Sequence, residues 1–158
     1  MEQKKALIRA FLFGAVSGMR SMIGAALISR HLANRHWATK ADPALALLSS
    51  PGAANVLTAL SAGEVIADKL PGIPARTKPF PLVARAAMGA LAGAAACSEE
   101  RENAAAGALI GAGAAVAVTF GAYYLRRWLT RDHGLADPVV AGAEDTVAYA
   151  IGQYAANM

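Results

Sequence analysis

Five ionisable side chains lie within otherwise apolar stretches of this sequence, where a charge needs a specific partner. They are Arg20, Glu64, Asp68, Glu144 and Asp145. Glu64 and Asp68 are four residues apart and would therefore share one face of a helix. A charge at the centre of a bilayer costs about 2.5–3.5 kcal/mol on insertion scales, so we expect Arg20 to pair with an acid. These residues form either a polar site within the membrane or a salt-bridge network that only fixes helix packing.

Cationic residues follow the acids of the second apolar stretch, in a segment whose prolines prevent a regular helix. The prolines are Pro71, Pro74, Pro79 and Pro81, and the residues that could hold an anion are Lys69, Arg76, Thr77 and Arg85. A guanidinium group binds phosphate as a two-pronged fork, and a hydroxyl adds a further donor. We therefore predict an anion-binding loop for a phospholipid head group or a small anion. The alternative is an ordinary cytoplasmic loop with the usual positive charge.

Three pairs of glycines have the spacing Gly-x-x-x-Gly. The pairs are Gly14 and Gly18, Gly89 and Gly93, and Gly107 and Gly111. Glycines with this spacing allow the backbones of two membrane helices to approach closely. We interpret all six as helix-packing residues.

The composition favours helices that cross a membrane as the elements that position these residues. Apolar residues make up 56% of the 158 residues and charged residues 16%, below the roughly 25% charged residues of soluble domains. The length fits one domain, residues 1–158. We therefore expect an all-α fold, a polytopic transmembrane bundle of about five spans. A soluble bundle rich in alanine is the alternative.

The five expected spans follow from the apolar stretches, because about 20 residues cross a hydrocarbon core of about 30 Å. They cover residues 6–29, 53–70, 82–97, 104–125 and 138–156. Residues 43–48 are too few to cross and are expected at the interface. The distribution of lysine and arginine then predicts a cytoplasmic N-terminus and a C-terminus on the other side.

A weak internal repeat links the first and fourth spans. The pattern from Gly14 to Gly18 resembles that from Gly107 to Gly111, and acidic residues follow both in a later segment. An offset of three spans would make the two copies opposite in orientation. That arrangement is the inverted repeat of many transporters, whose binding sites lie where the repeats meet.

Several other kinds of function find no support in the sequence. The single cysteine, Cys97, excludes an internal disulfide, and the three histidines lack the spacing of metal ligands. No metal or other cofactor is predicted, and enzymatic activity is uncertain and disfavoured. The net charge of +4 lies at expected membrane edges, so nucleic acid is not an expected partner.

Some of these residues together resemble a small bacterial membrane family known as domain of unknown function 4126. The matching motifs are Gly14-x3-Gly18-x-Arg20-Ser21, Gly63-Glu64-x2-Ala67-Asp68-Lys69-Leu70-Pro71, Pro74-x-Arg76-Thr77, Arg85-x3-Gly89 and Glu144-Asp145. The resemblance implies a multi-pass helical protein of the bacterial inner (plasma) membrane. It implies no activity.

Three functions remain open from the sequence. The leading one is a transporter or a protein that handles lipids or anions, with the five buried charges as its site and membrane lipids as partners. The second is a structural or accessory membrane protein that packs against a partner or a second copy of itself through its glycine faces. The third is a metal-dependent enzyme on a lipid phosphate, with the acids as ligands.

Overall fold

The computed structural model describes residues 2–35, 43–67 and 77–158, and within these ranges every regular element is an α-helix. The expected all-α class is therefore confirmed. The helices, in chain order, are α1 (Glu2–Met19), α2 (Ser21–Asn34), α3 (Pro43–Leu48), α4 (Pro51–Ala67), α5 (Pro79–Glu99), α6 (Ala104–Arg131) and α7 (Asp137–Asn157).

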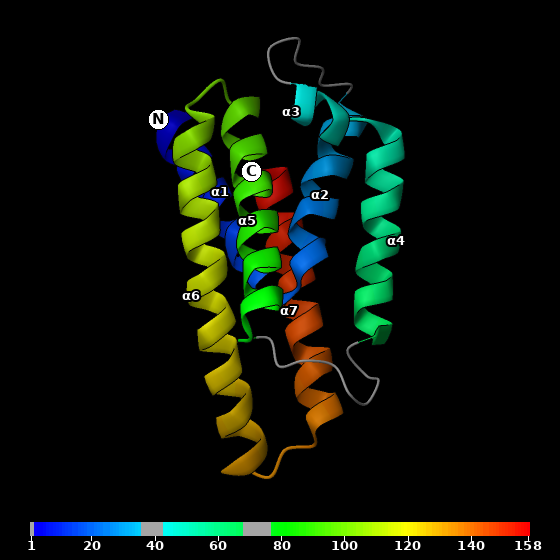
Figure 1. Cartoon of the computed structure of the whole chain (residues 1–158), viewed down its shortest axis with the longest axis vertical. Helices are drawn as coiled ribbons and strands as arrows, with labels where there is room; N and C mark the ends of the chain where they lie inside the picture. Colours follow the sequence, from blue (N-terminus) through cyan, green and yellow to red (C-terminus); the bar gives the residue numbers. More distant parts are fainter. Residues whose placement is uncertain (1, 36–42, 68–76) are drawn as a thin grey trace.

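The first apolar segment is two helices, which corrects the expectation of one span over residues 6–29. The helical path is interrupted at Arg20, whose backbone is extended with φ −138° and ψ 115°. From this point α2 returns toward the end at which α1 began (Figure 1). Gly24 of α2 packs against Ser17 and the carbonyl group of Phe13 in α1. The two helices are therefore antiparallel neighbours, a helical hairpin with its tip at Arg20.

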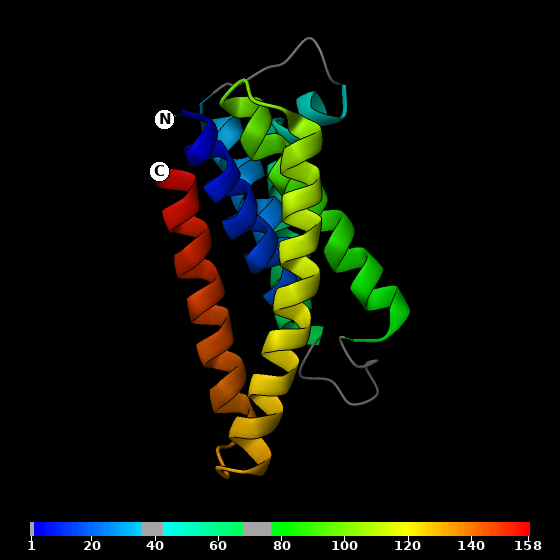
Figure 2. The ribbon, with the colours of Figure 1, turned by 90° about the vertical axis from the view of Figure 1, so that its left-hand side faces the viewer.

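The four helices that follow the hairpin and α3 run alternately down and up along the long axis of the molecule (Figures 1 and 2). They correspond to the last four expected spans, and α6, with 28 residues, is about 42 Å long at 1.5 Å per residue. The short helix α3 occupies the expected residues 43–48 at the upper end in Figure 1.

Both chain termini lie toward the upper end of the bundle (Figure 2). The Nε atom of Arg9 donates a hydrogen bond to the carbonyl oxygen of Ala155 at 3.0 Å, so the beginning of α1 and the end of α7 are in direct contact. The connection between α6 and α7 lies at the opposite, lower end. The fold therefore brings the two termini to the same end of the bundle.

The glycine pattern of α1 faces that of α6. Gly14 lies against Gly111, and Gly18 lies against Ala115 one turn further along. Because both residue numbers rise in the same direction, α1 and α6 run parallel. An inverted repeat requires its two copies to point in opposite directions, so the orientation of these two helices does not fit one.

The closest contact between helices joins α5 and α6, which are antiparallel. Gly93 lies against Gly107, and Gly89 lies against Gly111. A methyl group on Gly89 would come within 2.6 Å of the carbonyl oxygen of Gly111, closer than carbon and oxygen can approach. Only glycine permits this backbone separation, as small residues do between membrane helices.

Two substitutions within α6 test this packing. A methyl group on Gly111 would overlap the backbone of Gly89, whereas one on Gly113 would meet no atom within 4 Å. We expect Gly111→Ala to lower the free energy of unfolding by about 1–3 kcal/mol, the usual cost of overpacking. Gly113→Ala is the control and should leave stability unchanged or slightly raised. The measurement is thermal unfolding in detergent, and equal melting temperatures for the two variants would contradict the packing.

Candidate functional site

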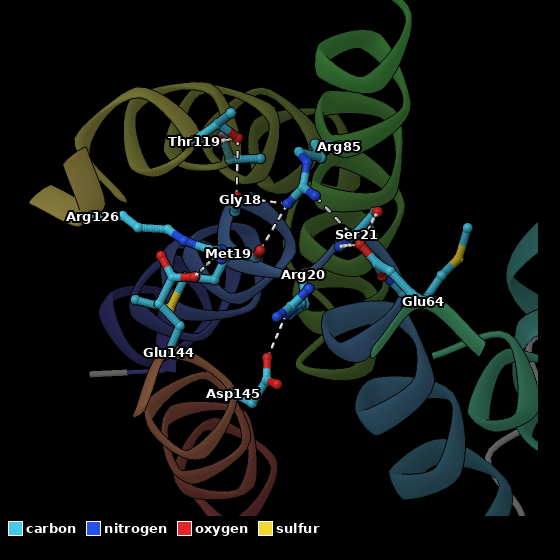
Figure 3. A network of polar contacts seen from close by, with 12 residues as sticks. Gly18, Met19, Arg20, Ser21, Glu64, Arg85, Thr119, Arg126, Glu144 and Asp145 are labelled. Carbon is cyan, nitrogen blue, oxygen red and sulfur yellow. Dashed lines mark hydrogen bonds and ion pairs between the residues drawn. The ribbon is translucent and has the colours of Figure 1, made fainter. Parts of the chain in front are cut away.

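The carboxyl end of α1 lies inside the bundle, where its last carbonyl groups need donors. The guanidinium group of Arg85, from α5, donates to the carbonyl oxygens of Gly18 at 2.9 Å and Met19 at 2.8 Å. The hydroxyl of Thr119, from α6, also donates to the Gly18 carbonyl, at 3.1 Å (Figure 3). A positive charge at this position also opposes the helix dipole. The break in the chain is therefore stabilised by residues of two other helices.

The amino end of α2 is held by one carboxylate, that of Glu64 in α4. Glu64 accepts hydrogen bonds from the backbone N–H of Ser21 at 2.9 Å, from the Ser21 hydroxyl at 2.6 Å and from the N–H of Met22 at 3.0 Å. A negative charge at a helix amino end is favourable because free N–H groups and the dipole both point toward it. Arg85 reaches Glu64 at 3.4 Å, so the groups that stabilise the two helix ends also contact each other.

The Arg20 side chain pairs with Asp145 of α7 (Figure 3). Its side chain is 1% exposed, whereas that of Asp145 is 23% exposed. The sequence predicts that Arg20 pairs with an acid, and the structure places an acid of the last expected span beside it. The unequal burial means that Asp145 is the more accessible member of the ion pair.

Adjacent acids of α7 face different partners. Glu144 lies 3.5 Å from Arg126 of α6, and Arg126 also forms a two-pronged pair with Asp137 at 2.8 and 2.5 Å. Among the contacts of the described residues, the two acids are thus divided between two arginines, Glu144 on Arg126 and Asp145 on Arg20.

The expected anion-binding loop is only partly within the described residues. Asp68, Lys69 and Arg76 lie outside them. Thr77 precedes α5 and is half-buried. The prediction that Arg85 belongs to this loop is wrong, since Arg85 lies within α5 with a buried side chain and holds the end of α1. A loop cation would instead face solvent.

A second charged cluster, near the upper end, was missed from the sequence. Arg9 is 2% exposed and pairs with Glu99, the last residue of α5, and with Glu100, which follows it, both at 2.7 Å. His31 of α2 contacts the other oxygen of Glu99 at 2.9 Å. These contacts join α1, α2 and α5 where the hairpin opens.

The sequence holds one signal that could have indicated this cluster. Arg9 precedes Arg20 by about three helical turns, so the two residues would share one face of the helix expected over residues 6–29. Two arginines on one face of an apolar helix predict two buried acidic partners. The acids at the end of α5 instead read as an ordinary polar turn, because nothing local relates them to Arg9.

The chemistry open to the helix break is anion exchange at a buried guanidinium group. Arg20 holds the carboxylate of Asp145, and a carboxylate or phosphate group of a ligand offers oxygen acceptors of the same kind. Within the described residues no three histidine, cysteine or acidic side chains are gathered as a metal ion requires. Glu64 and Asp145 have separate partners from different helices.

Comparison with models of protein families gives a match over most of the chain. The profile of a family described as a domain of unknown function (DUF4126) matches residues 7–158. The family resemblance expected from the motifs around Arg20, Glu64 and Arg85 is therefore confirmed. No curated protein and no solved structure matches the chain. The matched region includes the hairpin and all four long helices, so it includes the helix break.

Loss of the Glu64 charge should destabilise the hairpin tip. In Glu64→Gln one carboxylate oxygen becomes an NH2 group that faces an N–H donor, so one buried hydrogen bond is lost at a cost of about 1–3 kcal/mol. Glu102→Gln is the control, because within the described residues the Glu102 side chain makes no hydrogen bond or ion pair. Thermal unfolding in detergent gives the comparison. An unchanged melting temperature for Glu64→Gln would show that the helix end does not need this carboxylate.

Proposed function

This chain belongs to the family described as a domain of unknown function, DUF4126, and we propose that it is a polytopic membrane protein that transports or holds an anionic group. One observation carries the proposal: the helix break inside the bundle places a buried arginine, Arg20, opposite a partly accessible acid, Asp145. Interrupted helices whose ends meet in the middle of the membrane form the binding sites of many transporters.

The apolar helices support the placement in a membrane. Two of them, α5 and α6, are long and apolar enough to cross a bilayer. Of the residues in their most apolar stretches, only 39% and 28%, respectively, are buried within the protein. The core helix of a soluble protein would be mostly buried. Large apolar side chains such as Phe80 and Leu109, at 86% and 76% exposure, point outward instead. A hydrocarbon environment accounts for so much exposed apolar surface.

We propose that α4, α5, α6 and α7 each cross the bilayer and that the α1–α2 hairpin enters from one side and returns to it. Non-helical backbone at membrane depth is tolerated only where protein encloses it, which matches the enclosed break at Arg20. This arrangement has four crossings in place of the expected five. Of the available membranes, we propose the bacterial inner membrane, in keeping with the family resemblance.

The hairpin also changes the charge count on which the cytoplasmic N-terminus depended. That count placed Lys4 and Lys5 on the same side as Arg126, Arg127 and Arg131. The fold places the start of α1 and the end of α6 at opposite ends of the bundle. The basic residues are then divided between the two sides, so their distribution no longer supports one orientation.

Cysteine labelling tests the four-crossing arrangement. Cys97 is buried, so single cysteines can be introduced as Lys4→Cys, Asn157→Cys and His133→Cys, all at exposed positions. We expect a membrane-impermeant maleimide to label Lys4→Cys and Asn157→Cys from one side of sealed vesicles and His133→Cys from the other. Labelling of the two terminal positions from opposite sides would instead support an odd number of crossings.

In the proposed mechanism a ligand anion reaches the ion pair from the accessible side of Asp145 and competes for the Arg20 guanidinium group. Burial strengthens the attraction between the guanidinium group and an anion, because charges attract more strongly where water is excluded. Glu64 and Arg85 act as positioning residues. They hold the ends of α1 and α2 and so fix the direction in which Arg20 points.

Anion flux through reconstituted vesicles is the direct test. We expect concentration jumps of chloride, acetate or phosphate to evoke a current in vesicles with the native protein, and Arg20→Gln to abolish it by removing the binding charge. Arg127→Gln, an exposed cation at the lower end, is the control and should keep the current. If none of the three anions evokes a current from folded protein, the charged network serves helix packing alone.

A structural role is the second candidate, and the hydrogen bonds at the hairpin tip favour it. Three side chains on three other helices, Glu64, Arg85 and Thr119, hold the two helix ends in the way a packing network would. The glycine faces, however, are used within the chain, since Gly107 lies against Gly93 and Cys97. Association of copies through Gly107 and Gly111, as the sequence suggested, would require this contact to open.

A further inference from the structure

A groove of about 420 Å³ runs between α4 and α7, with α2 as its floor. Helix α4 packs against α2 and has little contact with α7, which leaves the groove between them. On α2 the lining residues recur every three or four positions, from Ile23 through Leu27 to Arg30. They therefore form one continuous face of the helix.

The groove is apolar along one part and cationic at one end. Ile23, Leu27 and Val65 line the apolar part, whereas Arg30 lies about 10 Å beyond Ile23 along α2, toward the upper end. The Arg30 guanidinium group donates one hydrogen bond, to the Thr58 hydroxyl at 2.9 Å. No carboxylate among the described residues pairs with it, whereas Arg9, Arg20, Arg85 and Arg126 all pair with acids.

We propose that this groove binds an anionic phospholipid of the leaflet at the upper end. Its phosphate would lie on Arg30, which offers the two-pronged donor geometry that phosphate prefers. One acyl chain would lie against Ile23, Leu27 and Val65. The inference rests on the membrane placement in the proposed function and names a substrate class or resident lipid for the same protein.

The lower part of the groove adjoins the charged site. Val65 follows Glu64 in α4, and Tyr149, which lines the other wall, lies one helical turn beyond Asp145 on the same face of α7. A lipid in the groove therefore extends from the upper membrane surface toward the Arg20–Asp145 pair. The groove is thus a route by which an anionic amphiphile could approach that pair.

Native mass spectrometry of the whole chain in mild detergent tests the site with three probes: phosphatidylglycerol, phosphatidylcholine and inorganic phosphate. We expect phosphatidylglycerol to bind more tightly than phosphatidylcholine. Arg30→Gln should lower the affinity for phosphatidylglycerol by about tenfold, as for a lost charge-assisted contact. Ala62→Trp, at an exposed position in the groove wall, should lower the affinity for both lipids because the indole ring fills the groove.

Two matched variants serve as controls. Arg127→Gln removes an exposed arginine and Ala143→Trp adds a large ring at an exposed alanine, both outside the groove, and both should bind lipid as the native protein does. Melting temperatures confirm that each variant is folded.

The remaining outcomes each overturn a defined part. If Arg30→Gln or Ala62→Trp keeps native affinity for phosphatidylglycerol, the groove is not the site. If inorganic phosphate binds as tightly as phosphatidylglycerol and Ala62→Trp has no effect, the ligand is free phosphate and the lipid inference fails. Lipid binding without anion flux would overturn the proposed transport alone, whereas flux without lipid binding would overturn this inference alone.

Discussion

The requirement that buried backbone groups be hydrogen-bonded shapes this protein more than any other constraint. A chain that reverses direction inside a helical bundle exposes the last carbonyl groups of one helix and the first N–H groups of the next. Neither set can find water there. Arg85 and Thr119 supply donors to the first set, and Glu64 supplies the acceptor for the second. The positions of α4, α5 and α6 around the hairpin follow from where these three side chains must reach.

The close packing of α1, α5 and α6 serves the same requirement. Arginine and threonine side chains reach the hairpin tip only if their backbones lie near it, and the contacts of Gly14, Gly89 and Gly111 bring the three helices together. The close glycine contacts are therefore a precondition for the hydrogen bonds that the charged and polar side chains make at the hairpin tip. A side chain on a glycine face would move α5 or α6 outward and withdraw Arg85 or Thr119 from the carbonyl of Gly18.

Local sequence patterns predicted the helices far better than the contacts between them. The last four apolar stretches correspond to α4, α5, α6 and α7 within a few residues, because hydrophobicity and proline positions act locally. The break at Arg20 could not be predicted in this way, since no proline lies there and the residues that stabilise it follow much later in the chain. Arg20 could be grouped with Asp145 from the sequence because a buried charge is costly and needs a partner, and the two residues form an ion pair. The partnership of Arg9 with Glu99 was missed because each residue looks ordinary within its own segment.

The hairpin has a consequence for the synthesis and membrane insertion of the protein. The hairpin tip at Arg20 emerges early in synthesis, whereas Arg85 emerges with α5 and Asp145 only with α7, the last helix. Until then the turn between α1 and α2 carries an uncompensated charge and unsatisfied backbone groups, which a lipid interior rejects. With the proposed membrane placement, the hairpin is therefore expected to stay at the membrane surface until the later helices are present, and to insert after them. The first helices of the sequence would then be the last to insert.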